Sequence, residues 1–253
     1  SNRRWHSRSL CRICEKGEIK FFLNSPFDKE KYERLLNGLE ISEIYLGIIE
    51  KDLLRLEAEF YTATTKSRNY GYTGENIIKK AQYGTSKELN ENGDGIPTLR
   101  LNEIKDTFIS EKPAKFCSKL SDTEIKSLYL QKGDVLICRT NGNANYVGRS
   151  GVVMENMHYV FASYLYRIIP DLEKINSETL VAFLNSKYGR EQINKQSMQS
   201  NQVNFSPAKF RKIDIPKIDT KIQNTIANMY SIAYTNIQNA SNKYSQAENL
   251  LIS

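Results

Sequence analysis

Three polar segments of this sequence carry side chains that can hydrogen-bond in pairs or bind anionic groups. Arg139–Ser150 combines arginine, asparagine, threonine and tyrosine, Ser197–Asn204 combines serine, glutamine and asparagine, and Tyr83–Lys87 adds hydroxyls and a lysine. Guanidinium and amide groups form paired hydrogen bonds with base edges in the major groove, while basic and hydroxyl groups bind phosphates. The three segments therefore carry the types of side chain that can contact a DNA duplex.

The candidate DNA-contacting residues lie in these segments, apart from one arginine further along the chain. An asparagine in a loop also forms turns, which is the simpler interpretation of any single one. Tyr83 and Tyr146 suit stacking on a base or sugar as well as burial, and Arg149 also suits an exposed ion pair. The set is Tyr83, Thr85, Ser86, Lys87, Arg100, Arg139, Thr140, Asn141, Asn143, Asn145, Tyr146, Arg149, Gln199, Ser200, Asn201 and Gln202.

Cys11 and Cys14 form a Cys-x-x-Cys pair, which is half of a zinc-ligand pattern. His6 is the only nearby third ligand, and the remaining cysteines and the second histidine lie far away in sequence. A thioredoxin-like role requires a strand–helix context that the sequence does not show. We therefore expect reduced thiols and no bound metal.

The sequence lacks the motifs of common catalytic and cofactor-binding sites. It contains no Gly-x-x-x-x-Gly-Lys phosphate loop, no Gly-x-Gly-x-x-Gly fingerprint and no Gly-x-Ser-x-Gly elbow. It also lacks the Asn-Pro-Pro-Tyr-type box of the amino-methyltransferases, and two histidines leave little for acid–base catalysis. Asp134 belongs to a turn signal, so we interpret it as a turn acceptor. We expect no catalytic residues, no enzymatic activity and no cofactor.

The bulk composition is that of a globular protein. The chain has 253 residues, with 36 Lys plus Arg against 29 Asp plus Glu, which gives a net charge of +7 and a pI near 9.1. This excess permits binding to a polyanion without requiring it. The sequence has neither a membrane-spanning apolar run nor a secreted disulfide framework, which favours a cytoplasmic location. It does not begin with Met, which suits a piece of a longer polypeptide.

Apolar runs and turn residues predict an α+β fold with a β-rich central part. We expect strands over Val135–Cys138, Gly148–Met154 and Tyr159–Ile169, the last interrupted near residues 162–163. A helix is expected from Ser177, acting as its N-cap, to about Gln196. Further expectations are a charged helix over Lys29–Leu39, a helical turn starting at Ser206-Pro207 and a short strand at Ile213–Ile215.

The C-terminal segment predicts a long helix with a coiled-coil seam. Apolar or small residues recur at steps of three or four, as helix pairing requires. We predict that this helix pairs with a second long helix, from this chain or another; the alternative is a helix lying on its own domain. The seam residues are Ile222, Ile226, Met229, Ala233, Ile237, Ala240, Tyr244, Ala247 and Leu251.

From about Leu56 to its end, the chain resembles one half of a specificity (S) subunit of type I restriction–modification systems. Ile218 departs from the family pattern, which often has a second proline there, and the residues before Arg55 match no family feature. The resemblance rests on Arg-Leu-Glu-Ala-Glu-Phe-Tyr at 55–61, Tyr-Gly-Thr-Ser at 83–86, Gly-Ile-Pro-Thr-Leu-Arg at 95–100, Gly-Asp-Val-Leu-Ile-Cys-Arg-Thr at 133–140, Val-Gly-Arg at 147–149, and Gln202, Asn204, Ser206, Ile215-Pro216 and Gln223.

The resemblance implies a target recognition domain at 55–217 and a conserved spacer helix at 218–253, with residues 1–54 of unclear role. Such a module reads one half of a bipartite double-stranded DNA site. It docks adenine methyltransferase subunits, which bind S-adenosylmethionine, and restriction subunits. A homodimer through the C-terminal helix would supply the second half. Two alternatives stay open: the recognition part of a fused methyltransferase–endonuclease, and a coiled-coil interaction protein without DNA affinity.

Overall fold

The computed structural model describes residues 9–14, 40–45, 71–105, 107–109, 112–197 and 203–252. The chain divides into two compact units, Ser1–Lys66 and Ser67–Ser253. In the first unit, strands β1 (Ser9–Cys14) and β2 (Glu40–Tyr45) pair in parallel. The predicted helix over Lys29–Leu39 lies outside the described residues. The second unit contains every candidate contact residue that the structure describes.

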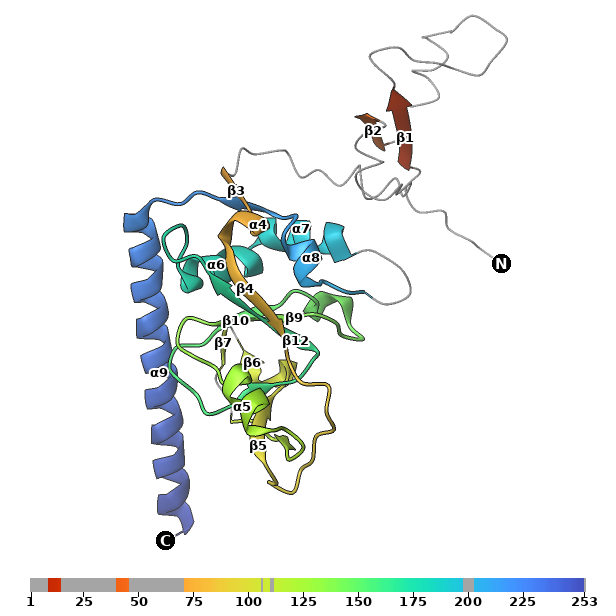
Figure 1. Ribbon diagram of the computed structural model, residues 1–253. Helices are drawn as coiled ribbons and strands as arrows, with labels where there is room; N and C mark the ends of the chain where they lie inside the picture. Colours follow the sequence, from red (N-terminus) through yellow and green to blue (C-terminus); the bar gives the residue numbers. More distant parts are fainter. Residues whose placement is uncertain are drawn as a thin grey trace, which may run out of the picture. The chain divides into compact units, whose positions relative to one another are not determined.

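A six-stranded mixed sheet forms the centre of the second unit (Figure 1). Its order is β4-β12-β9-β10-β7-β6, and only the β10–β7 pair within it is parallel. The α+β fold class is thus confirmed, as is the predicted interruption between β11 and β12. The strands are β4 (Ile78–Tyr83), β6 (Ile104–Lys105), β7 (Phe108–Ile109), β9 (Val135–Cys138), β10 (Ser150–Val152) and β12 (Leu165–Pro170).

The central strand β9 is buried on both faces. Val135 and Ile137 belong to one apolar cluster of the core, whereas Leu136 and Cys138 belong to another. Successive side chains of a strand point to opposite faces, so a strand covered on both sides must be apolar throughout. This requirement explains why a continuous apolar run, without alternation, predicted the bounds of β9 correctly.

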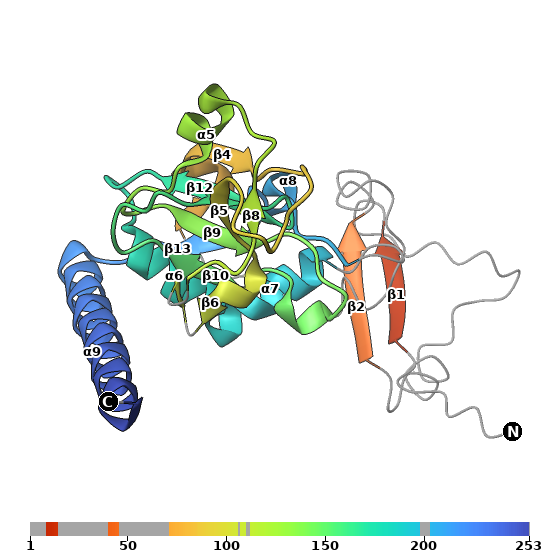
Figure 2. The ribbon, with the colours of Figure 1, turned by 90° about the horizontal axis from the view of Figure 1, so that it is seen from below.

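Different elements cover the two faces of this sheet (Figures 1 and 2). Helix α6 (Ser177–Asn185) contributes Leu180, Val181, Phe183 and Leu184 to the core on one face. On the other face lie a three-stranded sheet, ordered β11-β5-β8, and the helix α5. Their bounds are β5 (Ile96–Leu99), β8 (Phe116–Cys117), β11 (Val160–Phe161) and α5 (Asp122–Leu128), and the short helices are α4 (Gly74–Ile77), η1 (Leu101–Glu103) and η2 (Ala144–Tyr146).

The helix predicted from Ser177 is two helices, α6 and α7 (Lys187–Ser197), separated at Ser186. A Cβ on Gly189 would lie 2.1 Å from the carbonyl oxygen of Phe183, so the chain folds back tightly here. The predicted cap is also wrong by one residue. Asn176 caps α6 by accepting a hydrogen bond from the Thr179 amide at 2.8 Å, while the Ser177 hydroxyl donates to the Gly133 carbonyl.

A buried ion pair ties the second face of the sheet together. The Arg167 guanidinium lies 2.9 Å from the Asp134 carboxylate, and each side chain is 5% exposed. Arg167 also donates to the carbonyls of Tyr129 and Ser127, each at 2.8 Å, and to the side chain of Gln82. Asp134 in turn accepts from the Gln131 amide at 3.0 Å, which supports its interpretation as a turn acceptor.

The chain then crosses to the long helix through a short helix and a two-stranded sheet. Helix α8 (Pro207–Phe210) is capped by Ser206, as predicted, and strand β13 (Asp214–Pro216) pairs with β3 (Gly71–Thr73). Helix α9 (Thr220–Ile252) follows. Gln223, near its start, accepts from the Asn176 amide at 2.8 Å and donates to two carbonyls. These bonds fix the direction in which α9 leaves the domain.

Helix α9 has one apolar face packed on the domain and another that is exposed. Tyr230, Ala233, Tyr234 and Ile237 pack against the core, and the Tyr234 hydroxyl donates to Glu155 at 3.0 Å. Ile222, Met229 and Tyr244, by contrast, are 55%, 62% and 75% exposed. The predicted seam therefore borders the packed face at Ala233 and Ile237, and the alternative of packing on its own domain holds for part of the helix.

The second half of α9 extends without support from the domain. All residues from 239 to 251 are exposed. The domain therefore does not cover the helix along its whole length. Despite its length, α9 is too polar to span a bilayer, and the same holds for the other helices in the described part of the chain.

Candidate nucleic-acid interface

The loop from Arg139 to Arg149 projects from the sheet between β9 and β10. Its base is closed by two hydrogen bonds of 2.8 Å, from the Cys138 amide to the Arg149 carbonyl and from the Gly148 amide to the Cys138 carbonyl. Because β9 is held on both sides in the sheet, the two ends of the loop are fixed on a rigid base. The two arginines at its ends, Arg139 and Arg149, are therefore positioned by the core.

Two asparagines shape this loop from inside. The side-chain oxygen of Asn141 accepts from the Asn143 amide at 2.8 Å, and that of Asn143 accepts from the Asn145 amide at 3.0 Å. These are turn-forming bonds, as the simpler interpretation predicts. The side-chain NH2 groups of both residues have no hydrogen-bond partner among the described residues. Each asparagine can therefore hold the turn and still donate to a ligand.

Tyr83, Arg139 and Asn204 come together at one end of the sheet from distant parts of the sequence. The Arg139 guanidinium lies 5.4 Å from the centre of the Tyr83 ring, and Tyr83 is 47% exposed. Thr140 pairs with Asn204 in a β-bridge, and the Phe205 amide donates to the Arg139 carbonyl at 2.8 Å. We call Tyr83, Arg139, Thr140 and Asn204 the sheet-end group.

The sheet-end group contains polar atoms without partners inside the protein. Arg139 Nε and Asn204 Oδ1 are both buried without a hydrogen bond. Arg139 has no ion pair among the described residues, and its guanidinium contacts the Tyr83 ring instead. Unpaired buried polar atoms cost stability. Arg139 and Asn204 are nevertheless partly exposed as residues beside the exposed Tyr83 ring, and this surface suits an external hydrogen-bonding partner.

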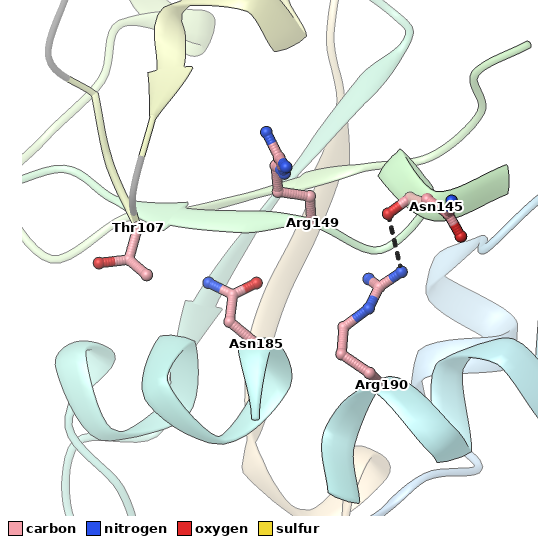
Figure 3. A pocket seen from close by; sticks show the side chains of 5 residues that line it. All are labelled: Thr107, Asn145, Arg149, Asn185 and Arg190. Carbon is pink, nitrogen blue, oxygen red and sulfur yellow. Dashed lines mark hydrogen bonds between the residues drawn. The ribbon is translucent and has the colours of Figure 1, made fainter. Parts of the chain in front are cut away.

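A second group forms at the other end of the loop. The Arg149 guanidinium lies 4.7 Å from the centre of the Tyr146 ring. Arg190, from α7, donates to the carbonyls of Val147 at 2.8 Å and Asn145 at 3.1 Å. Burial, and then the charge of Arg149, lowers the pKa of Arg190. The helix α7 thus holds the end of the loop and adds a cation to it (Figure 3).

Gly148 allows this close approach of loop and helix. Its φ is +78°, and a Cβ there would lie 2.3 Å from Cγ2 of Ile193 on α7. Only glycine adopts this conformation without strain. Arg149 therefore owes its position to a residue that carries no functional group.

Several other candidate residues are occupied within the protein. Thr85 is 8% exposed and accepts from the Lys87 amide at 3.1 Å. The Lys87 ammonium donates to the Glu124 carboxylate and to the Lys119 carbonyl, each at 2.7 Å. Arg100 pairs with Glu103 at 3.2 Å. Ser86 is exposed. Of these, only Ser86 presents a side chain that the fold does not already use.

The remaining candidates, Gln199, Ser200, Asn201 and Gln202, lie outside the described residues. The chain returns at Val203, whose carbonyl accepts from the Thr140 hydroxyl at 3.4 Å. Val203 and Asn204, the first described residues after them, lie beside the start of the Arg139–Arg149 loop.

The cysteines and acidic residues of the described part offer no metal site, since no group of three or more potential ligands is gathered there. Burial raises the pKa of Cys138 to about 11, so this thiol stays protonated near neutral pH. The backbone of Cys11 and Cys14 belongs to β1, and their side chains lie outside the description.

Three residues that the sequence interpretation missed surround the second group. Thr107, Asn185 and Arg190 line a pocket of about 320 Å³ together with Asn145 and Arg149. Asn185 donates to the Ser150 carbonyl at 2.8 Å and accepts from the Ser150 amide at 3.2 Å, which holds the start of β10. Asn185 and Arg190 lie in helices, where polar side chains are usually solvent-exposed, so residue type alone does not indicate a contact there.

Comparison with known proteins gives one significant sequence match. The chain is 31% identical over 84 residues to the specificity subunit of the type I restriction enzyme EcoKI from Escherichia coli strain K12. The match covers 33% of this chain and 18% of that protein. No protein-family model matches.

Two solved structures are similar over most of this chain. One comes from work on complex assembly and conformational transition of a type I R-M system; it is 17% identical, with a TM-score of 0.48 over 87% of this chain and 50% of that one. The other, the HsdS subunit of Thermoanaerobacter tengcongensis, is 16% identical, with a TM-score of 0.44 over 86% of this chain and 49% of that one. This chain therefore spans about half the length of each. The EcoKI match supports the resemblance carried by the motifs: over 84 residues this chain is similar to a type I specificity subunit.

Proposed function

We propose that this chain is a sequence-specific DNA-recognition module that reads one half-site and does no chemistry itself. The β-rich domain contacts double-stranded DNA, and α9 docks adenine methyltransferase subunits, with restriction subunits joining the same assembly. S-adenosylmethionine belongs to the methyltransferase in this proposal. The matched EcoKI protein is a specificity subunit by name, and this role is extended here to the present chain.

The sheet-end group is the observation that best supports DNA reading. It joins the exposed ring of Tyr83 with two partly exposed polar residues, Arg139, which has no ion pair with a described residue, and Asn204. Arginine and asparagine form bidentate bonds with guanine and adenine edges, respectively. The loop amides of Asn141 and Asn143 extend the same surface. Such side chains, fixed on a rigid sheet, suit direct readout in the major groove.

The test is recovery of a sequence preference. The full chain is purified together with the adenine methyltransferase encoded beside it, and methylated adenines are mapped across the genome of the expressing cell. We expect one bipartite motif, and the same motif should compete best in duplex-binding assays. Binding should weaken steeply as salt rises, because phosphate contacts release counterions. Methylation without a shared motif, or no duplex binding in the complex, would contradict the proposal.

The exposed face of α9 supports a second part of the proposal, helix pairing. Ile222, Met229 and Tyr244 share one side of the helix and are exposed, whereas the domain covers the neighbouring side. We propose that a second long helix covers this face: a methyltransferase helix, or α9 of a second copy in antiparallel orientation. Two copies would place two recognition domains at the ends of one helical pair.

Sedimentation of the full chain at micromolar concentration tests the homodimer. We expect a dimer that Met229→Glu disrupts, because a charge on the seam must be buried on pairing. Asn228→Glu places the same charge at an exposed neighbouring position and serves as the control. A monomer at all concentrations would exclude self-pairing and leave the methyltransferase helix as the partner to test.

The alternatives give different results in the same experiments. A recognition part of a fused methyltransferase–endonuclease would be encoded in one reading frame with catalytic motifs upstream. A coiled-coil protein without DNA affinity would pair through α9 yet shift no duplex, even with the methyltransferase present.

A further inference from the structure

The pocket between the Arg139–Arg149 loop and helices α6 and α7 holds two cations. Figure 3 shows Arg190 extending from its helix toward Asn145, and Asn185 extending from the end of α6 into the space between Thr107 and Arg149. Its volume of about 320 Å³ leaves room for a small anionic group with its flanking atoms. All five lining side chains are polar, and two are arginines.

Neither arginine is neutralised by a carboxylate of the described residues. Among the described residues, no carboxylate forms an ion pair with Arg149 or Arg190. Arg190 donates only to the carbonyls of Val147 and Asn145, and the Tyr146 ring contacts Arg149. Uncompensated charge removed from water is costly, and two like charges repel. An anion in the pocket would relieve both costs.

The two arginines also differ in how firmly their guanidinium groups are fixed. The guanidinium of Arg190 is held in place by two carbonyls, so it loses little freedom when it binds an anion. Arg149 is exposed and makes no hydrogen bond through its guanidinium to another described residue. One cation is thus fixed and one is free to close on a ligand. Thr107, at the rim, has φ of +78°, a conformation that β-branched residues adopt rarely and that recurs at ligand sites.

We propose that this pocket binds a phosphodiester group of the DNA backbone, with Arg149 and Arg190 as its cationic ligands. The inference rests on the proposed DNA binding and extends it, because Arg190, Asn185 and Thr107 belong to helices and a strand end outside the recognition loops. The pocket adjoins the end of the loop whose start carries the sheet-end group. One backbone contact there sets the register of the loop on the duplex without reading sequence.

The first experiment tests the pocket without DNA. Thermal unfolding of the full chain is followed during titration with low-millimolar inorganic phosphate, with chloride holding the ionic strength constant. Low concentrations matter, because phosphate at high concentration stabilises any folded protein by exclusion from its surface. We expect saturable stabilisation of the wild type. Arg149→Gln should weaken the apparent affinity for phosphate by about tenfold, as expected for the loss of a charge-assisted hydrogen bond.

Arg211→Gln is the matched control for the charge. Arg211 is paired with Glu75 and does not line the pocket, so its variant should bind phosphate as the wild type does. Arg149→Lys keeps the charge and should retain part of the affinity. Arg149 is the residue of choice, because Arg190 also supports two loop carbonyls. Equal phosphate response in the wild type and Arg149→Gln would overturn the pocket, as would an absence of saturation.

The second experiment uses duplex DNA at several salt concentrations. Loss of one phosphate contact lowers the slope of log K against log salt by about 0.9. We expect this change for Arg149→Gln, with similar weakening for the recognised and for unrelated sequences. An unchanged slope with altered sequence preference would mean that Arg149 reads a base, and would refute the phosphate site. Saturable phosphate binding without any DNA binding would instead uphold the pocket and refute the proposed function.

Discussion

Arg167 and Arg139 lie at neighbouring strands of one sheet and have opposite surroundings. Arg167 is buried, paired with Asp134 at 2.9 Å and bonded to two carbonyls. Arg139 is partly exposed, lies over Tyr83, and has no ion pair with a described residue. The same side chain thus stabilises the fold in one region and remains available to a ligand in the other.

The difference shows how to recognise a functional cation in this molecule. Net charge does not distinguish the two regions, whereas the groups that each cation contacts do. Within the part of the chain that the structure describes, Arg167, Arg100 and Lys87 pair with carboxylates, while Arg139, Arg149 and Arg190 contact only carbonyls or aromatic rings. Replacing members of the first set should affect stability, and replacing members of the second should affect binding.

Arg167→Met should give the largest effect. It removes one partner of a buried pair and leaves the Asp134 carboxylate without its cation, together with two unbonded carbonyls. Loss of one member of such a pair costs about 3–5 kcal/mol of unfolding free energy. Urea denaturation of the variant and the wild type measures this loss of unfolding free energy.

The double variant Arg167→Met with Asp134→Leu provides the control. It removes both charges and should recover part of the lost stability, because no unpaired charge remains. If Arg167→Met alone unfolds at the wild-type urea concentration, the buried pair does not support the sheet and the comparison fails.

Gly148→Ala should come next, with a loss of about 1–3 kcal/mol. The substitution places a side chain at a φ of +78° and within 2.3 Å of Ile193. It should also displace Arg149 and weaken phosphate and DNA binding, so that one substitution affects both the stability of the fold and the ligand-binding region. Gly142→Ala, in the same loop, is the matched control, since a Cβ there meets nothing within 4 Å. Equal melting temperatures of the two variants would contradict the close approach of loop and helix.

Local sequence patterns predicted the parts of the fold that depend on local physics. Strand β9 has the predicted bounds because a strand buried on both faces must be apolar throughout. Ser206 caps α8 because the hydroxyl accepts from the Lys209 amide three residues on. The break at Ser186 was not predictable in this way. It depends on the fold of α7 against the end of α6, where Gly189 leaves no space for a Cβ.

The candidate site, too, could be predicted only in its local features. The sequence predicted the polar character of the Arg139–Arg149 loop, but residue type alone did not separate free from occupied groups. Residue type predicted a DNA contact at Lys87, although Glu124 pairs with it. It predicted none at Arg190, although this residue adds a charge to the loop. Both facts depend on contacts between residues more than thirty positions apart in the sequence.

Arg139→Gln should leave stability nearly unchanged and reduce sequence discrimination. A bidentate contact of arginine with a guanine contributes about 1–3 kcal/mol of discrimination against other bases. We expect the recognised site to lose affinity while unrelated duplexes change little, as measured by competition binding. Arg211→Gln again controls for the charge. Equal weakening on all sequences would assign Arg139 to the phosphate backbone and remove it from base readout.

The smallest effect is expected at Glu124, the carboxylate that occupies Lys87. Hydrogen bonds from Lys87 and from the Ser121 amide and hydroxyl lower the pKa of Glu124 from 4.5 to about 2. A carboxyl with a lowered pKa in the folded state stabilises the fold above its ordinary pKa. This contribution is lost as pH falls from about 4.5 to about 2. Since the pair is at the surface, solvent screens it and the change in melting temperature should be small.

Glu124→Gln isolates this contribution. Melting temperatures of the wild type and the variant should differ most near neutral pH and converge as the pH falls through the interval where Glu124 becomes protonated. DNA binding at neutral pH should match that of the wild type, because Lys87 belongs neither to the sheet-end group nor to the phosphate pocket. If the variant instead binds DNA several-fold more tightly, Lys87 reaches the duplex once released, and the paired cations of this domain form a reserve of DNA contacts that Glu124 holds back.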